Sequence, residues 1–114
     1  MAVKYILRLP GPSRARGAEP SLSFTSDGAG GLAAELQAAL RDDALFQRWR
    51  ALQEDPDEVD DALGATDPAA TVVGKQEDLM IELHATTSIP SGILKQRLKW
   101  LAGDHWVLAD VRNP

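Results

Sequence analysis

Residues 79–86 read LMIELHAT, and a helical pattern follows them from about Pro90 to Ala102. The first stretch alternates apolar and polar side chains, which is typical of a strand with one buried face. In the second stretch three leucines recur on one face of the expected helix, and Gly103 follows as a stop: Leu94, Leu98 and Leu101. A strand followed at once by an amphipathic helix predicts a helix that packs against a sheet.

The remaining segments extend this pattern in both directions. Four of them resemble strands by composition and alternation: residues 2–9, 21–26, 71–75 and 105–111. The last of these is apolar on both faces, which predicts a central or doubly covered position. Residues 32–52 carry two helical stripes that point in nearly opposite directions. They predict a helix broken at Asp42-Asp43, with Asp43 as the N-cap of the second piece.

The resulting order is strand, strand, broken helix, strand, strand, helix, strand. It predicts an α+β two-layer sandwich of ferredoxin-like βαββαβ order with an additional N-terminal strand. The helices are expected on one face of a mostly antiparallel sheet. Residues 1–114 are expected to form a single small domain, with mobile loops at about 10–20 and 54–70.

Composition narrows the class of protein. The 114 residues include no cysteine, so disulfides and thiolate metal sites are excluded. The N-terminal apolar run is too short for a signal peptide, and no stretch has the length of a membrane helix. These features, with alanine-rich and arginine-rich usage, favour a bacterial-type cytoplasmic protein.

Charge is segregated along this acidic chain, whose net charge is −5. Residues 1–16 and 89–103 are locally basic, whereas 54–61 carry only acids. The acidic run lacks the spacing of a calcium loop, and no metal or cofactor is expected. The net charge makes nucleic acid an unlikely partner, but binding through a local basic face that includes Lys95, Lys99, Arg14 and Arg16 stays open.

The last helix carries the first candidate site. Arg97 and Trp100 lie three residues apart, so their side chains can touch on the flank of the leucine stripe. Arg and Trp together are favoured in protein interfaces. Lys95 and Lys99 lie on the opposite side. These four residues predict a surface for a protein partner or a second copy of the chain.

The second candidate site is a ligand-binding one. Gly30 and Gly31 open the first helix, and Ser88 and Ser91 open the last one, where free N–H groups can hold an anion. His84 shares a strand face with Glu82, and His105 begins the last strand. These residues leave open a small enzyme or a domain that binds an anion or phosphate ligand, although no catalytic set is assigned.

The face of the sheet without helices is the third candidate surface. It is expected to present six side chains from the two best-defined strands: Lys4, Ile6, Arg8, Met80, Glu82 and His84. The last strand adds either Trp106 and Leu108 or Val107 and Val111. Because no catalytic set is convincing, the sequence favours a non-catalytic protein-interaction or regulatory module.

Overall fold

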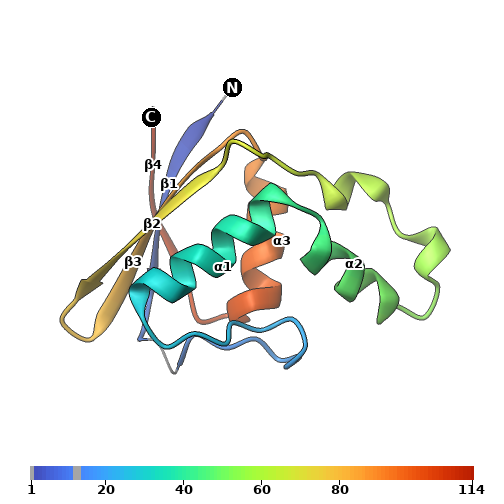
Figure 1. Ribbon diagram of the computed structural model, residues 1–114, viewed down its shortest axis with the longest axis horizontal. Helices are drawn as coiled ribbons and strands as arrows, with labels where there is room; N and C mark the ends of the chain where they lie inside the picture. Colours follow the sequence, from blue (N-terminus) through green and yellow to red (C-terminus); the bar gives the residue numbers. More distant parts are fainter. Residues whose placement is uncertain (1, 12–13) are drawn as a thin grey trace.

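The computed structural model describes residues 2–11 and 14–114 (Figure 1). Residues 12 and 13, which belong to the loop expected at 10–20, lie outside the described residues. The chain forms an α+β fold of one four-stranded antiparallel sheet and three helices, in this order: β1 (Val3–Leu9), α1 (Ala29–Arg41), α2 (Ala44–Ala51), β2 (Thr71–Glu77), β3 (Met80–Thr87), α3 (Ser91–Ala102) and β4 (Val107–Arg112). Two short 3₁₀ turns, η2 (Pro56–Glu58) and η3 (Asp61–Gly64), precede β2.

The strands lie in the order β2-β3-β1-β4, and every neighbouring pair is antiparallel. Figure 1 shows α1 and α3 on one side of the sheet and α2 farther out on that same side. The alternation in β1 explains this arrangement, because Tyr5, Leu7 and Leu9 enter the core. None of the helices in the described residues has the length and apolar character needed to cross a membrane.

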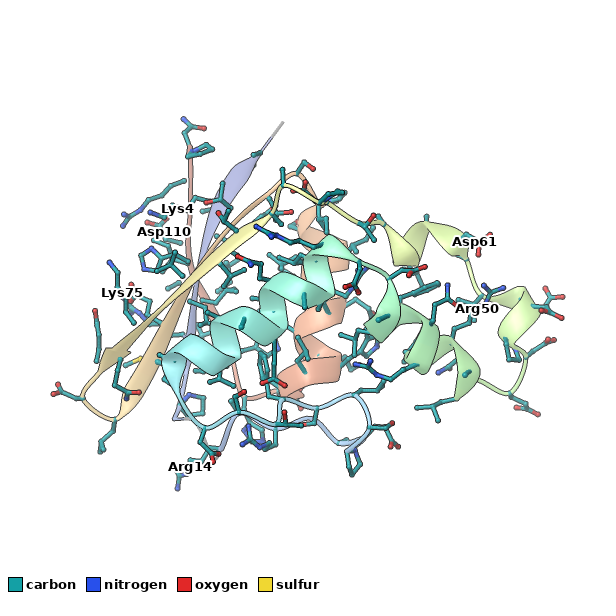
Figure 2. All side chains as sticks on the ribbon, in the orientation of Figure 1. Lys4, Arg14, Arg50, Asp61, Lys75 and Asp110 are labelled. Carbon is teal, nitrogen blue, oxygen red and sulfur yellow. The ribbon has the colours of Figure 1, made fainter. Side chains whose placement is uncertain are left out.

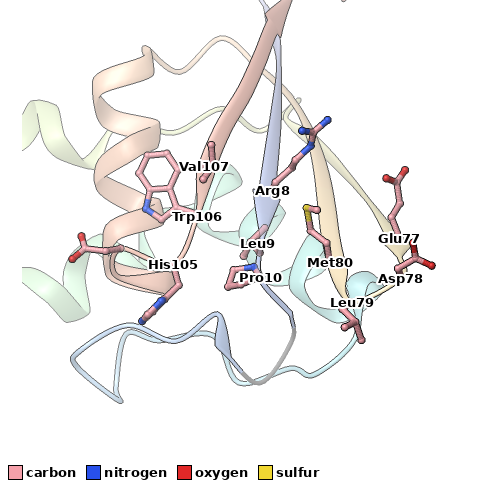
Figure 3. A pocket seen from close by; sticks show the side chains of 11 residues that line it. Arg8, Leu9, Pro10, Glu77, Asp78, Leu79, Met80, His105, Trp106 and Val107 are labelled. Carbon is pink, nitrogen blue, oxygen red and sulfur yellow. The ribbon is translucent and has the colours of Figure 1, made fainter.

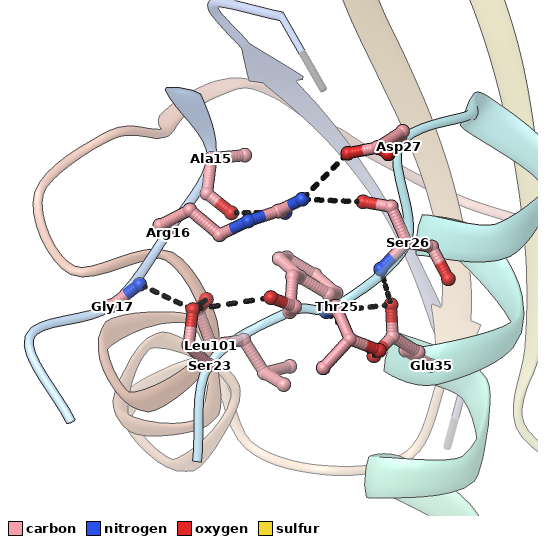
Figure 4. Close-up of polar contacts among 10 residues, drawn as sticks. Ala15, Arg16, Gly17, Ser23, Thr25, Ser26, Asp27, Glu35 and Leu101 are labelled. Atoms are coloured by element: carbon pink, nitrogen blue, oxygen red, sulfur yellow. Dashed lines mark hydrogen bonds and ion pairs between the residues drawn. The ribbon is translucent and has the colours of Figure 1, made fainter. Parts of the chain in front are cut away.

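Residues 21–26 do not form the strand that their alternation predicts. Leu22 and Phe24 do enter the core, but Leu22 lies in a turn and Phe24 in irregular backbone beside the end of α3, and neither joins the sheet. The Phe24 N–H donates to the carbonyl oxygen of Leu101 at 2.9 Å. The N–H groups of Thr25 and Ser26 donate to the Glu35 carboxylate, each at 3.0 Å (Figure 4). The additional N-terminal strand is therefore absent from these residues.

The helix break at Asp42-Asp43 is confirmed. Helix α1 ends at Arg41 and α2 begins at Ala44. Asp43 is the N-cap residue, but its side chain makes no capping bond. The side chain of Asp42 accepts the N–H of Ala44 at 2.9 Å instead. The break lets α1 bury Leu36 and Leu40 against the sheet while α2 turns its own apolar side toward α3.

Strand β4 lies at an edge of the sheet, so the expectation of a central position is wrong. Ala109 is an extra residue in this strand, because Leu7 faces Leu108 while its neighbour Ile6 faces Asp110. Such a bulge reverses which side chains face the core. Val107 and Val111 consequently lie on opposite faces, and both are largely exposed.

Helix α3 ends where the sequence predicts. Its last residue is Ala102, and Gly103 follows at a φ of 62°, in the left-handed region that suits glycine. Leu94, Leu98 and Leu101 are buried as expected. The C-terminal end of α3 thus directs the chain into β4.

Candidate functional site

The side of the sheet opposite the helices forms a continuous surface, here called the uncovered face, over which no helix of the described chain lies (Figure 1). Figure 2 shows Lys4, Lys75 and Asp110 on this side. The strand registers place the following residues on it: Lys4, Ile6 and Arg8 from β1; Thr71, Val73, Lys75 and Glu77 from β2; Met80, Glu82, His84 and Thr86 from β3; and Val107, Asp110 and Arg112 from β4.

A polar relay crosses the middle of this face. Nε of Arg8 donates to Oε2 of Glu82 at 3.3 Å, and Nε2 of His84 lies 2.6 Å from Oε1 of the same carboxylate. The bond from His84 is the main cause that lowers the pKa of Glu82 below its ordinary value, and Arg8 lowers this pKa further. Beneath the relay Ile6 is buried, although it points away from the helices. The centre of the face therefore holds an ion pair of Arg8 and Glu82, with His84 bonded to the same carboxylate.

One end of the uncovered face opens into a groove of about 860 Å³ (Figure 3). It lies between the tip of the β2–β3 hairpin and the start of β4, and the end of β1 lies between these two walls. The groove residues are Arg8, Leu9, Pro10, Glu77, Asp78, Leu79, Met80, Asp104, His105, Trp106 and Val107. Apolar side chains form much of its wall, and Glu77, Asp78 and Asp104 are exposed at its rim.

A smaller hollow of about 230 Å³, here called the cup, lies elsewhere on the same face. Its lining residues are Lys4, Thr71, Val73, Lys75, His84 and Thr86. The cup shares no lining residue with the groove. The relay joins the two, because Arg8 lines the groove and His84 lines the cup.

Arg97 and Trp100, which the sequence offers as a partner surface, are both buried. Helix α2 covers them, because Trp49 stacks on Trp100 with ring centroids 4.8 Å apart. The guanidinium of Arg97 lies 5.7 Å from the Trp100 ring centroid and donates to the carbonyl oxygen of Ala65. The physical reason is that the second apolar stripe, after the helix break, packs on this flank of α3.

Lys95 and Lys99 are exposed, and only Lys99 borders a hollow that Trp100 also lines. They line a shallow hollow of about 260 Å³ together with Asp104 and Trp106. The four residues predicted as one surface therefore fall into a buried pair and an exposed pair.

Just before α3 a carboxylate of the chain itself binds the segment that leads into the helix. The N–H of Ser88 donates to Oδ2 of Asp67 at 2.9 Å, and the hydroxyl of Thr87 donates to the same oxygen at 2.8 Å. Pro90 is the N-cap residue, and Ser91 is the first residue of the helix. The negative charge of Asp67 disfavours a second anion at Ser88 and Ser91.

At the start of α1, Gly31 has a packing role. A Cβ at this position would lie 2.6 Å from the side chain of Ser26, so only glycine allows this approach. A Cβ at Gly30 would meet open space. Neither glycine lines the groove or the cup.

The two histidines occupy different places. His84 lies beside Glu82, as their shared strand face predicts, whereas His105 lines the groove. The described residues contain no group of three or more His, Asp or Glu side chains arranged to hold a metal. The geometry offers two binding hollows on one face.

The sequence does not predict either hollow, although it predicts part of the face on which they lie. The alternation of β1 and β3 placed Lys4, Arg8, Glu82 and His84 on one face, and the structure agrees. The sequence alone does not place Thr71 and Lys75 on that face, although an alternation of β2 in step with β3 puts them there. Comparison with protein-family models, curated proteins and solved structures gave no match to this chain.

Proposed function

We propose that the chain is a non-catalytic protein-interaction module of a bacterial-type cytoplasmic protein, and that it binds its partner in the groove. The observation that carries this proposal is the gathering of exposed apolar side chains at one end of the uncovered face. Leu79 is 88% exposed, Val107 62% and Met80 40%. Clustered apolar exposure at a concave site favours a binding role, because contact with a partner removes that surface from water.

The groove also has a rigid wall. The indole N–H of Trp106 donates to the carbonyl oxygen of Gly103 at 2.9 Å, which orients the ring. On the other side Asp78 adopts a φ of 53° in the turn that carries Leu79. Because the Trp106 ring is already held, this side of the groove loses little entropy when an apolar side chain of a partner packs against it.

The charge at the rim of the groove indicates which residues of the partner flank its apolar side chain. Glu77, Asp78 and Asp104 are exposed, and within the described chain none of them forms an ion pair. Arg8, the cation in the groove, is already paired with Glu82. We therefore infer a partner segment that carries an apolar anchor flanked by Lys or Arg.

We propose a ferredoxin-like relationship because the elements run βαββαβ when α1 and α2 are taken together, and because the sheet order is β2-β3-β1-β4. In that arrangement one sheet face is left without helices, and this face is the surface available to a partner.

A displayed library of short random peptides, selected against the immobilised domain, tests the groove. Enriched peptides should combine a large apolar residue with Lys or Arg. Their affinity should fall about tenfold or more when Val107→Glu or Met80→Glu places a carboxylate in the groove wall.

Leu52→Glu is the matched control, because Leu52 is an exposed apolar side chain (54%) at the end of α2, away from the groove. This variant should retain the affinity of the unmodified domain. Selection of no peptide, or of peptides that bind all three variants equally, contradicts the proposal. Light scattering of the free domain identifies self-association, which would make a second copy the occupant.

A further inference from the structure

We propose that the cup is a binding site for a phosphate-type oxyanion, either free phosphate or the phosphate group of an organic monoester. The site shares no lining residue with the groove and does not depend on the function proposed above. Two lysines, two threonines and His84 line it together with Val73. These are the donor types that bind phosphate oxygens, and acidic side chains are absent from the lining.

The strand registers place Lys4 and Lys75 on either side of His84. Lys4 of β1 lies opposite Thr86, two residues from His84 along β3. Lys75 of β2 lies opposite Glu82, which is two residues from His84 in the other direction. Diagonal neighbours of this kind are about 7–8 Å apart, a distance that long lysine side chains span easily. The two ammonium groups can therefore approach one ligand from opposite sides of His84.

Neither lysine has a carboxylate partner in the described chain. Two acids on the same face are engaged elsewhere: Glu82 is bonded to Arg8 and His84, and Asp110 pairs with Arg112 at 2.7 Å. Glu77, two residues from Lys75 along β2, does not line the cup. The cup is thus a concentration of positive charge on a chain whose net charge is −5. A bound anion relieves the repulsion between these cations, which favours binding.

Hydroxyl groups complete the donor set. Thr71 and Thr86 lie directly opposite each other on β2 and β3, and Thr86 also faces Lys4 on β1. In the described residues no hydrogen bond within the chain engages either hydroxyl. Both can donate to an oxyanion.

His84 is held in place for this role. Its Nε2 lies 2.6 Å from Glu82, and Glu82 is held in turn by Arg8. A ring fixed by a carboxylate loses little freedom when a ligand arrives. The cup has a volume of about 230 Å³, which accommodates a phosphate group, while the apolar groove is several times larger.

Titration of the ¹⁵N-labelled domain with inorganic phosphate at low ionic strength tests this inference. The expected result is saturable shifts of the amide signals of Lys4, Thr71, Lys75 and Thr86, with a Kd of about 1 mM. The double substitution Lys4→Met and Lys75→Met should weaken binding about tenfold, through loss of two charge-assisted contacts.

The double substitution Lys95→Met and Lys99→Met is the matched control, because it removes the same charge from exposed lysines on α3. It should leave the Kd for phosphate unchanged within about twofold. Phenyl phosphate as a second titrant distinguishes an organic monoester from free phosphate, and sodium chloride at equal ionic strength measures the screening contribution.

The proposal would be overturned if sodium chloride shifted the same amide signals as much as phosphate does, or if both double variants weakened phosphate binding equally. It would also be overturned if the signals that shift were centred on Lys95 and Lys99. If the Lys4 and Lys75 double variant does not fold, Lys75→Met alone decides, since this side chain is exposed. It should raise the Kd about threefold. The amides of Met80 and Val107 report on the groove separately, so a loss of binding at one hollow is distinguished from a loss of binding at the other.

Discussion

Arg97 of α3 donates a hydrogen bond from Nη2 to the carbonyl oxygen of Ala65, with 2.7 Å between the two atoms. The side chain is 0% exposed, and its Nε and Nη1 atoms have no partner in the described chain. Burial accordingly lowers the pKa of Arg97 from its ordinary value. A cation in the interior with one hydrogen bond costs stability, because desolvation is only partly offset.

Replacing Arg97 with Met should leave the domain equally stable or stabilise it by about 1 kcal/mol. Methionine fills much of the same volume and removes the desolvation cost, at the loss of the bond to Ala65. Arg97→Ala should instead destabilise by about 2–4 kcal/mol, because it leaves a cavity. Urea unfolding followed by circular dichroism measures both, and a loss of stability in the Met variant as large as in the Ala variant would contradict the first expectation.

The stacked pair Trp49 and Trp100 should couple α2 to α3. Their rings are 4.8 Å apart and inclined by 23°. In a double-mutant cycle with Trp49→Leu and Trp100→Leu we expect an interaction free energy of about 1 kcal/mol. Unfolding free energies of the four proteins give this value, and strict additivity of the two single changes would show that the stack contributes nothing.

Gly74→Ala should destabilise the domain by about 1–3 kcal/mol. A Cβ at Gly74 would clash with the carbonyl oxygen of Ala29, so the first turn of α1 would have to move away from β2. Gly92→Ala is the control, because a Cβ there meets nothing within 4 Å. Gly92 lies in α3, where alanine should stabilise by about 0.5–1 kcal/mol. Thermal unfolding should therefore shift in opposite directions for the two variants.

Stability should fall in acid partly through Asp67. The N–H of Ser88 is the main cause that lowers the pKa of Asp67, and the Thr87 hydroxyl and Ala69 N–H lower it further. Because the pKa in the folded protein is below that in the unfolded chain, this contribution is complete above about pH 4 and is lost as pH falls through the folded value.

Asp67→Asn should therefore be about 1–2 kcal/mol less stable than the unmodified domain near neutral pH. The difference between the two proteins should shrink toward about pH 2. Urea midpoints measured across this range check the expectation. Asp57→Asn, in the exposed acidic segment, is the control and should track the unmodified domain. A difference that stays constant with pH would assign the effect to packing rather than to charge.

Periodicity explains which elements the sequence predicted well. Strands β1 and β3 and helix α3 each repeat an apolar side chain at the spacing of one face, and Leu7, Leu83 and Leu98 lie where that spacing places them. The helix break was equally predictable, since two stripes of opposite phase cannot both pack from one straight helix.

Contacts between residues that are far apart in sequence explain the features that the sequence alone does not predict. The alternation in residues 21–26 predicts a strand, but the N–H groups of Thr25 and Ser26 donate to the Glu35 carboxylate and are not available to a neighbouring strand. The extra residue Ala109 shifts the alternation within β4, so its apolar side chains lie on both faces although the strand is at an exposed edge. The flank of α3 looked accessible because nothing near it in sequence covers Arg97 and Trp100, whereas Trp49 and Ala65 do so in space.

The central place of β1 has a consequence for how the chain folds. This strand is synthesised before both of its neighbours, which lie far along the sequence, with Val3 facing Thr87 and Lys4 facing Arg112. The sheet can therefore close around β1 only after β3 and β4 have left the ribosome. Loop closure over such separations is slow, and until then the apolar side of β1 stays open to chaperones and to other nascent chains.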